Sequence, residues 1–214
     1  LIIDYSIFIG QFYVGLLVLW TLLIAFGYIF LKKDIFRLMR IVREPTMLAF
    51  ATASSESAYP KTMEALEKFG VPKRITSFVL PLGYSFNLDG SMMYMAFAVL
   101  FIAQAYNIDL SFSQQALILF TLMITSKGIA GVSRASIVVI ASTLAMFKLP
   151  EAGILLILAI DQFLDMGRTA TNVIGNSIAT AVIARTEGNK DELTEQEGIM
   201  VNNIPPANQL ADNS

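Results

Sequence analysis

The chain carries near its start a long stretch without any charged residue, and this stretch limits most strongly what the chain can fold into. It runs from Ser6 to Leu31 and reads SIFIGQFYVGLLVLWTLLIAFGYIFL. About 20 apolar helical residues are enough to cross the roughly 30 Å hydrocarbon core of a bilayer. A signal peptide would have a shorter apolar region, a basic flank and a cleavage site of small residues, which this segment lacks. The sequence therefore predicts a membrane-spanning helix here.

The composition extends this prediction to most of the chain. Hydrophobic residues make up 55 % and charged residues 15 %, against roughly 45–50 % and about 25 % in soluble domains. The absence of cysteine and histidine removes disulfides, thiolates and the usual base or metal ligand at neutral pH. We expect a multi-pass protein of the cell (inner) membrane that is not an enzyme, with the lipid bilayer as a partner. A net charge of -2 argues against nucleic acid as a partner.

A short segment in the first third of the chain is predicted to enter the membrane and return. Residues 46–58 lie between two basic stretches, 32–45 and 61–74, and the positive-inside tendency places both stretches in the cytoplasm. The segment between them then forms a re-entrant helical hairpin with its tip near residues 54–57. Non-helical backbone at membrane depth is tolerated only where protein or a water-filled cavity covers it.

A second hairpin is predicted around the glycine-containing sequence SKGIAGVSR, residues 126–134. The apolar arms on either side, 115–125 and 135–147, would each reach about halfway across a membrane at 1.5 Å rise per residue. The preceding loop, residues 107–114, has no cation, so this hairpin is expected to enter from the external side. A glycine-hinged hairpin that opens outward would suit a gate.

Two longer apolar segments complete the predicted order. Residues 75–106 are interrupted by NLDGS, which predicts a spanning helix broken in its middle, and residues 152–184 form a last span. The polar tail that follows is predicted to be disordered. The expected boundaries are 1–32 for the first span, 33–74 for the first hairpin, 75–106 for the broken span, 107–150 for the second hairpin, 151–185 for the last span and 186–214 for a cytoplasmic tail.

The predicted fold class is an all-α membrane protein with two re-entrant helical hairpins and broken transmembrane helices. A hairpin followed by a span occurs twice with opposite entry, which is the inverted repeat of secondary transporters. In such proteins a binding site lies near the membrane midplane, between the broken helices. A bundle of ordinary helices with irregular loops is the alternative interpretation.

Polar residues in the last span are spaced by four, three, four and four positions, so they share one helical face. They are Asp161, Asp165, Arg168, Asn172 and Asn176. An ionisable side chain inside a membrane helix costs at least about 2.5–3.5 kcal/mol on insertion scales, so several of them need each other, a cavity or a ligand. One interpretation is that the two acids only neutralise Arg168. The other is a site in which a planar guanidinium binds a carboxylate and Asp165 binds an ammonium.

Two further polar clusters interrupt the apolar segments. The sequence NLDG at 87–90 would expose backbone carbonyls that form, with the Asp89 carboxylate, an oxygen cage suited to sodium; a glycine-driven kink is the alternative. The sequence SSES at 54–57 would present hydroxyls and free N–H groups to an anion if a helix starts there, although most serine runs are solvated turns.

Four segments together resemble the glutamate transporter family, the dicarboxylate/amino acid:cation symporters. The resemblance rests on ASSESAYP, PLGYSFNLDGSMMY, SKGIAGVSRAS and DQFLDMGRTATNVIGNSIATAVIA, in this order, and it covers residue 1 to about residue 187. It implies that the chain begins at the sixth transmembrane helix, that the broken and last spans are the seventh and eighth, and that an N-terminal scaffold lies outside this chain. It also implies a homotrimer and an elevator motion of the domain that carries the site.

The resemblance implies a substrate site for glutamate or aspartate. Ser54 and Ser55 would bind the α-carboxylate, with Gly131 and Val132 closing over it. Arg168 and Ser91 would bind the side-chain carboxylate. The implied partners of the amino group are Asp165 and Asn172, with Thr169 as a further contact.

The resemblance also implies coupling to Na+ and/or H+ and no other cofactor. The implied sodium ligands fall in three sets: Asn87 with Asp89; backbone carbonyls around Ser85, Ser126 and Ile129; and Gly83, Asn87, Asn172 and Asn176. Asn176 stands where sodium-coupled relatives have aspartate, which removes a formal charge and favours proton coupling, with Asp161 and Asp165 as candidate proton carriers. Met95 stands where animal members have a glutamate linked to potassium countertransport. Arg134 near the gate has no assigned role.

The expected function is symport of acidic amino acids, L-glutamate or L-aspartate, driven by a proton and/or sodium gradient. A C4-dicarboxylate:cation symporter is the alternative, because it would also need Arg168. The presence of Asp165 favours a substrate with an ammonium group, and Arg168 disfavours a neutral amino acid. An ion channel is disfavoured because no charged ring or repeated filter sequence is present.

Overall fold

The computed structural model describes residues 2–127 and 135–202, and the regular elements within these ranges are all helices. In chain order they are α1 (Ile2–Leu31), α2 (Asp34–Ile41), α3 (Arg43–Thr52), α4 (Ser55–Phe69), α5 (Lys73–Phe86), α6 (Asp89–Ala105), α7 (Phe112–Thr125), α8 (Ala135–Met146), the 3-10 turn η1 (Glu151–Gly153), α9 (Ile154–Leu158) and α10 (Asp161–Asn202). The all-α part of the predicted fold class is therefore confirmed.

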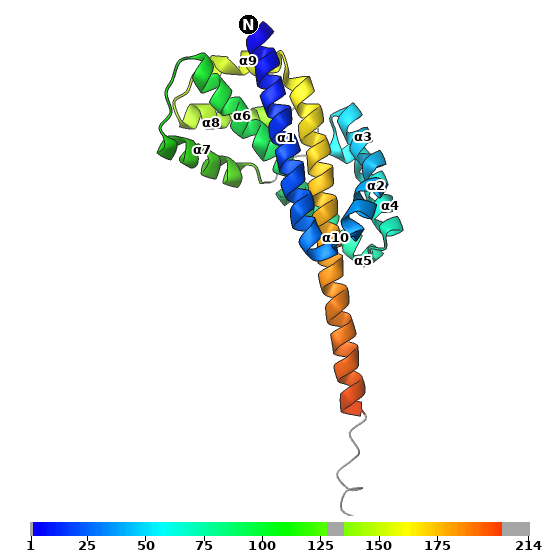
Figure 1. The fold of residues 1–214 in the computed structure, drawn as a ribbon. Helices are drawn as coiled ribbons and strands as arrows, with labels where there is room; N and C mark the ends of the chain where they lie inside the picture. Colours follow the sequence, from blue (N-terminus) through cyan, green and yellow to red (C-terminus); the bar gives the residue numbers. More distant parts are fainter. Residues whose placement is uncertain (1, 128–134, 203–214) are drawn as a thin grey trace, which may run out of the picture.

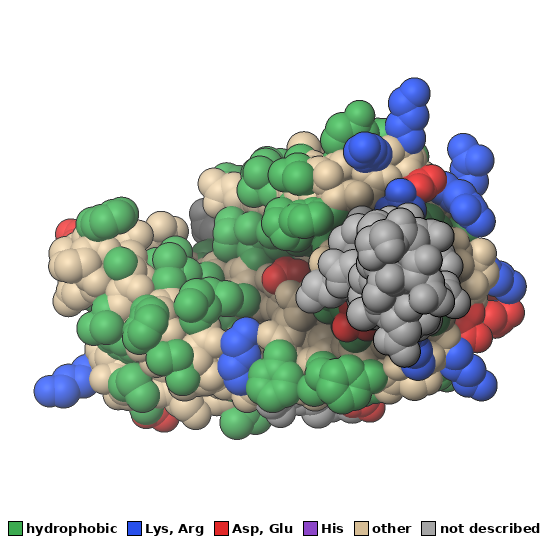
Figure 2. Space-filling view, turned by 90° about the horizontal axis from the view of Figure 1, so that it is seen from below, with side chains coloured by type: hydrophobic (Ala, Val, Ile, Leu, Met, Phe, Trp, Pro, Cys, Tyr) green, Lys and Arg blue, Asp and Glu red, His purple; other side chains and the backbone are tan. Residues whose placement is uncertain are grey.

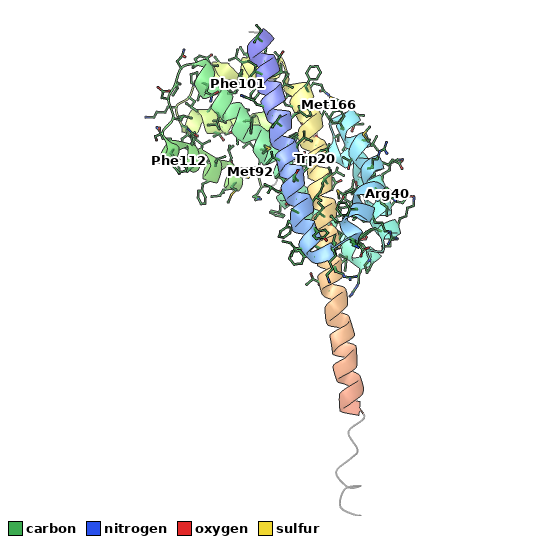
Figure 3. All side chains as sticks on the ribbon, in the orientation of Figure 1. Trp20, Arg40, Met92, Phe101, Phe112 and Met166 are labelled. Carbon is green, nitrogen blue, oxygen red and sulfur yellow. The ribbon has the colours of Figure 1, made fainter. Side chains whose placement is uncertain are left out.

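The two long helices α1 and α10 lie side by side through the centre of the molecule, with α2 to α5 on one side and α6 to α9 on the other (Figure 1). A polar contact joins them, since the Trp20 indole N–H donates to the Thr171 hydroxyl at 2.7 Å. Trp20 lies midway along α1, facing α10 (Figure 3). Helix α10 contacts α1 to α6 and also α9. It is therefore the element around which the others are arranged.

The outer surface of α1 is strongly apolar. Two segments are long and apolar enough to cross a membrane, namely Tyr5–Leu31 of α1 and Lys73–Ala105, which comprises α5 and α6. Large side chains such as Val14, Leu17 and Leu22 are more than half exposed on α1. A contiguous apolar surface of this kind is typical of contact with lipid or with another protein.

Charged side chains gather on one side of the molecule as it is seen in Figure 2. Seen from below, Lys and Arg lie mainly over the side formed by α2 to α5, whereas hydrophobic side chains dominate the side of α6 to α8 (Figure 2). Ion pairs join Lys61 to Glu44 and Lys68 to Glu64. Hydrogen bonding between Glu64 and Lys68 lowers the pKa of the carboxyl and raises the pKa of the ammonium.

The first helical hairpin consists of α3 and α4. Ala53 turns the chain with a φ of 49°, and the Ser54 hydroxyl then caps α4 by accepting from the Ser57 N–H at 3.4 Å. The turn lies at Ala53 and Ser54, at the near edge of the predicted tip. The basic stretch before it, for which no helix was predicted, contains α2, because Ile35 and Leu38 form a buried apolar stripe at helical spacing.

The chain breaks between α5 and α6 at Asn87 and Leu88, inside the NLDGS sequence. Both residues have non-helical backbone angles, and α6 begins at Asp89. The second helical hairpin has α7 and α8 as its arms, and a further break at residues 159–160 separates α9 from α10. This second break was not predicted.

The predicted tail, residues 186–214, is described as far as residue 202, where it forms the end of α10. Helix α10 continues to Asn202 and extends well beyond the other helices (Figure 1). Periodicity does not reveal this extension because the tail sequence has few apolar residues to mark a buried face. The remaining predicted tail, 203–214, lies outside the described residues.

Helices α6 and α10 approach each other closely at Gly90. A Cβ atom on Gly90 would meet the Arg168 carbonyl oxygen and would lie 2.8 Å from the Thr171 Cβ and 3.0 Å from the Arg168 carbonyl carbon. Two of these atoms belong to the backbone of α10, so a side chain could not move aside to relieve the overlap. The glycine therefore sets the distance between the start of α6 and the middle of α10.

We predict that Gly90→Ala lowers the thermal unfolding temperature of the detergent-purified full-length protein. Overpacking of this kind typically costs about 1–3 kcal/mol. Gly10→Ala on α1 is the matched control, because a Cβ there would have no neighbour within 4 Å. Equal unfolding temperatures for the two variants would show that α6 and α10 are not in close contact at Gly90.

Candidate functional site

The polar face predicted for the last span is buried in the interior of the molecule. Each of its five residues has at most 1 % of its surface exposed, namely Asp161, Asp165, Arg168, Asn172 and Asn176. Residues that share a helical face and are shielded from solvent form a continuous polar stripe within an apolar core. The arrangement requires polar partners, because isolated buried charges are very costly.

An ion pair between Arg168 and Asp165 lies at the centre of this face. The Nε and Nη2 groups of Arg168 both contact the same carboxylate oxygen of Asp165, one helical turn away. Both side chains are almost fully buried. Removal of one partner of such a pair typically costs about 3–5 kcal/mol, because the other charge is left uncompensated.

Two serine hydroxyls also contact the guanidinium. The Arg168 Nη1 group donates to the Ser91 hydroxyl at 3.0 Å and to the Ser136 hydroxyl at 3.3 Å. Ser91 belongs to α6 and Ser136 to α8, so three helices meet at Arg168. Ser136 was not among the predicted site residues, although it is the last residue of the segment SKGIAGVSRAS, on which the family resemblance partly rests.

Asn172 connects this centre to the break in the chain. Its Oδ1 accepts from the backbone N–H groups of Gly90 at 2.9 Å and Ser91 at 3.3 Å, and its Nδ2 donates to the Ser91 hydroxyl at 2.9 Å. These N–H groups belong to the first turn of α6, which has no side-chain cap from Leu88. A residue of α10 therefore caps α6 from outside.

The remaining predicted substrate residues lie at three places. Thr169 donates its hydroxyl to the Asp165 carbonyl at 2.6 Å, within α10. Ser54 and Ser55 lie at the turn between α3 and α4, and this hairpin packs on Val173 of α10, next to Asn172. Gly131 and Val132 lie outside the described residues.

The predicted sodium ligands Asn87, Asp89 and Asn176 surround two glycines. The Asn87 Nδ2 donates to the Asn176 Oδ1 at 3.3 Å. A Cβ on Gly83 would collide with this Oδ1, and a Cβ on Gly175 would collide with the Asp89 carboxylate. The two glycines thus give room for amide and carboxylate groups to approach the backbone.

The donor set in this region fits sodium poorly. The Asn172 oxygen already accepts two hydrogen bonds, and the Asn176 Nδ2 is a buried donor without a partner among the described residues. No group of three or more acidic, histidine or cysteine side chains in the described ranges could hold a metal ion. Around Ser85 and Ser126 the predicted ligands are backbone carbonyls, and the hydroxyls of these two residues donate to carbonyls of their own segments; Ile129 lies outside the described residues.

Asp161 lies at the start of the polar face with a partner that was not predicted. The Tyr94 hydroxyl donates to an Asp161 carboxylate oxygen at 2.5 Å, and both residues are fully buried. Tyr94 belongs to α6, in the position before Met95. This contact holds the carboxylate against α6, one turn from Asp165.

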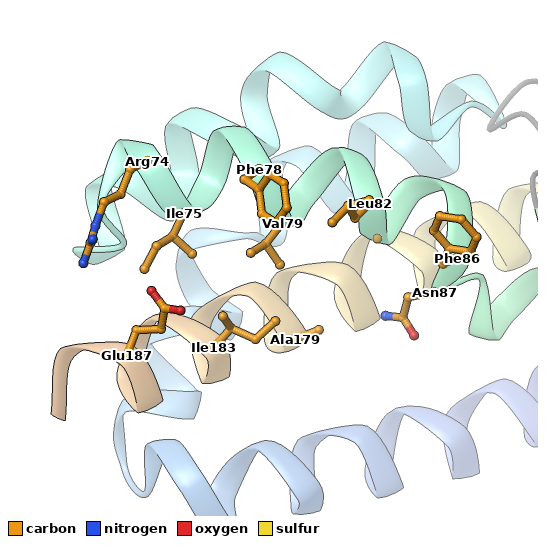
Figure 4. Close-up of a pocket in the computed structure, with 11 residues that line it drawn as sticks. Arg74, Ile75, Phe78, Val79, Leu82, Phe86, Asn87, Ala179, Ile183 and Glu187 are labelled. Atoms are coloured by element: carbon orange, nitrogen blue, oxygen red, sulfur yellow. The ribbon is translucent and has the colours of Figure 1, made fainter. Parts of the chain in front are cut away.

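A groove of about 510 Å³ lies between α5 and α10 and reaches Asn87 at the helix break. Apolar side chains of α5 such as Phe78 and Leu82 face Ala179 and Ile183 of α10, with Asn87 at one end (Figure 4). Arg168, Asp165 and Ser91 do not line it. The apolar lining does not suit a charged small molecule, so the candidate site is the polar centre around Arg168.

A buried ionic centre between broken helices, in a molecule with a strongly apolar exterior, is characteristic of a membrane transporter. Residues 1–186 match the model of the sodium:dicarboxylate symporter family, and the chain belongs to this family. The resemblance noted in the sequence is thereby confirmed.

Curated relatives support the same conclusion. The chain is 53 % identical over 159 residues to the proton/sodium-glutamate symport protein of Bacillus caldotenax, which covers 74 % of this chain and 38 % of that protein. It is 52 % identical over 150 residues to the proton/glutamate-aspartate symporter of Escherichia coli K12, covering 70 % and 34 %. A C4-dicarboxylate transport protein 2 of Mesorhizobium japonicum is 42 % identical over 192 residues, covering 89 % and 43 %. The chain thus spans less than half the length of these relatives, all of which are named as transporters.

We predict that Ser91→Ala weakens the polar centre, because Arg168 and Asn172 both donate to this hydroxyl. Buried donors that lose their acceptor cost about 1–3 kcal/mol each. The thermal unfolding temperature of the full-length protein should fall, and Ser91→Thr, which keeps a hydroxyl, should remain close to the parent. A Ser91→Ala variant as stable as Ser91→Thr would contradict the described hydrogen bonds.

Proposed function

We propose that this chain is the substrate-binding part of a symporter for the acidic amino acids L-glutamate and L-aspartate. A proton and/or sodium gradient drives uptake across the cell (inner) membrane. The full-length protein is a homotrimer in which the domain that carries the site moves by an elevator mechanism. The names of the relatives in Bacillus caldotenax and Escherichia coli support this substrate class and this coupling.

The observation that carries the proposal is the buried pair of Arg168 and Asp165. A substrate carboxylate that displaces Asp165 from the guanidinium would leave Asp165 as an uncompensated buried carboxylate, which is strongly unfavourable. An acidic amino acid brings an ammonium as well as the carboxylate. Both members of the pair then keep an opposite charge, so the exchange leaves no buried charge unpaired.

The neighbouring groups suit the rest of such a substrate. A guanidinium binds a carboxylate with two parallel hydrogen bonds, and Ser91 and Ser136 lie within reach of the same guanidinium. The turn at Ser54 and Ser55 starts α4, whose N-terminal N–H groups favour an anion. In the proposed complex this turn binds the α-carboxylate, and Asn172 with Thr169 lies beside the amino group.

The two helical hairpins support the alternating-access part of the proposal. Each hairpin is followed by a segment that is itself interrupted, at Asn87 and Leu88 in one case and at residues 159–160 in the other. In the proposed topology, both hairpins are re-entrant, enter from opposite sides and act as gates to a site at the midplane. Gly131 and Val132 belong to the outer gate.

A C4-dicarboxylate:cation symporter is the second candidate, because a relative of that name is 42 % identical over 192 residues. A dicarboxylate would bind Arg168 but would bring no cation to Asp165. Its binding would therefore require that Asp165 stays paired with Arg168 or takes up a proton. This requirement makes an acidic amino acid the better fit.

Uptake of labelled glutamate, aspartate and succinate by the full-length protein in vesicles tests the proposal. Sodium and pH gradients are imposed separately, with no-gradient vesicles as the control. We expect glutamate and aspartate uptake that depends on at least one gradient, and succinate uptake at least about tenfold slower. Succinate uptake without glutamate uptake would contradict the substrate assignment. Uptake at the same rate with and without the two gradients would contradict symport.

We also predict that Arg168→Cys abolishes the transport of glutamate and aspartate, because the side-chain carboxylate loses its partner. With Asp165 then free to pair with a substrate ammonium, neutral amino acids should begin to compete for uptake. Arg185→Cys is the matched control, since Arg185 lies on the same helix but is exposed. If glutamate transport survives Arg168→Cys, the role of this arginine is wrong.

A further inference from the structure

Lys127 makes an unusual contact at the end of a broken helix. Its ammonium donates to the backbone carbonyl of Phe86, the last residue of α5, at 2.7 Å. In the sequence, Lys127 comes after Ser126, the residue that caps the C-terminal end of α7. The side chain thus bridges the two halves of the chain, across 41 positions in the sequence.

The place that this ammonium occupies has a negative potential for three reasons. It lies at the C-terminal end of α5, where unpaired carbonyls give the helix a partial negative charge. It also follows the C-terminal end of α7, which contributes in the same sense. The carboxylate of Asp89 lies near enough to interact with it electrostatically. Two helix ends and a carboxylate would attract any small cation.

The same position coincides with one of the sodium sites that the sequence suggested. The expected ligands Ser85 and Ser126 are the direct chain neighbours of Phe86 and Lys127. Carbonyl oxygens at an unwound helix end are the groups that coordinate sodium in transporters of this architecture. Here one of those carbonyls already accepts a hydrogen bond from a covalently attached cation, so the chain does not fit an ion at this point.

We propose that Lys127 is a tethered cation that takes the place of a sodium ion between the end of α5 and the start of the second hairpin tip. The inference rests on the proposed function and makes it more specific. At one of the expected sodium sites, the positive charge is supplied by a side chain of the protein and not by a bound ion. Substrate binding then needs no sodium at this position. The Lys127 ammonium also links the second hairpin to α5 whichever salt is present. A sodium ion would link them only while it is bound.

The side chain of Asn176 gives independent support for a site that does not need a sodium ion. The region beside Asn87 and Asp89 holds a neutral amide whose buried Nδ2 has no partner within the described ranges. A buried N–H donor repels a cation. Among the described residues, this end of the site holds one carboxylate, Asp89, and one ammonium, Lys127, which balance each other without a dissolved ion.

The test compares Lys127→Met with Lys127→Arg in the detergent-purified, substrate-free full-length protein. Thermal unfolding is measured in sodium chloride and in choline chloride of equal concentration. We expect Lys127→Met to be destabilised in choline and restored by sodium, with a larger sodium response than the parent, whereas Lys127→Arg behaves as the parent. A loss that sodium does not restore, or no loss at all, would overturn the proposal.

Chemical restoration of the charge provides the second measurement. The chain has no cysteine, so Lys127→Cys introduces a single reactive thiol into this part of the protein, on a background in which any cysteine elsewhere is replaced. Modification with an aminoethyl reagent rebuilds a lysine-like ammonium, and a methyl reagent gives a neutral side chain. We expect the aminoethyl form to respond to sodium as the parent does, and the methyl form to keep the larger stabilisation by sodium. Equal responses in both forms would contradict a role for the charge.

Aspartate binding to the same variants separates this proposal from the proposed function. The affinity of Lys127→Met for aspartate should fall at least about tenfold in choline, equivalent to about 1.4 kcal/mol, and should recover in sodium. If the parent binds neither aspartate nor glutamate, the proposed function fails, while the sodium response of the substrate-free variants still decides the role of Lys127.

Discussion

A buried ion pair within one helix, Arg168 with Asp165, is the interaction on which the rest of the structure depends. Two charges inside an apolar core are tolerated only if their remaining hydrogen-bonding groups are also satisfied. Helices α6 and α8 supply those groups through Ser91 and Ser136, and Asn172 ties the start of α6 to the same centre. The burial of the pair thus explains why helices from distant parts of the chain converge on α10.

The break at Asn87 and Leu88 follows from the same requirement. An uninterrupted helix from α5 to α6 would have its backbone N–H groups paired internally, and Asn172 could not accept from Gly90 and Ser91. The broken end of α5 leaves a carbonyl that Lys127 satisfies. The structure therefore balances charge within the chain at two places, by Asp165 at the centre and by Lys127 at the edge, and the proposed function exploits the first of these balances.

Much of this arrangement could be predicted from the sequence, because it is encoded locally. The spacing of the polar residues in the last span placed them on one face, and NLDGS marked the helix break. The contacts that give the site its geometry could not be predicted in this way. Ser136 and Arg168 are 32 positions apart, and Tyr94 and Asp161 are 67 apart, so their proximity depends on tertiary packing. The helix α2 was missed because its charged residues outweighed the short apolar stripe of Ile35 and Leu38.

In the proposed complex, the substrate replaces both members of the ion pair at once: its carboxylate takes the place of Asp165 on Arg168, and its ammonium takes the place of Arg168 on Asp165. A high-resolution experimental structure of the full-length protein with bound aspartate tests it most directly. The account predicts that the Arg168 guanidinium binds the side-chain carboxylate, that the substrate ammonium lies within hydrogen-bonding distance of Asp165, and that Arg168 and Asp165 no longer contact each other. Aspartate bound elsewhere, or bound with the pair intact, would contradict the account.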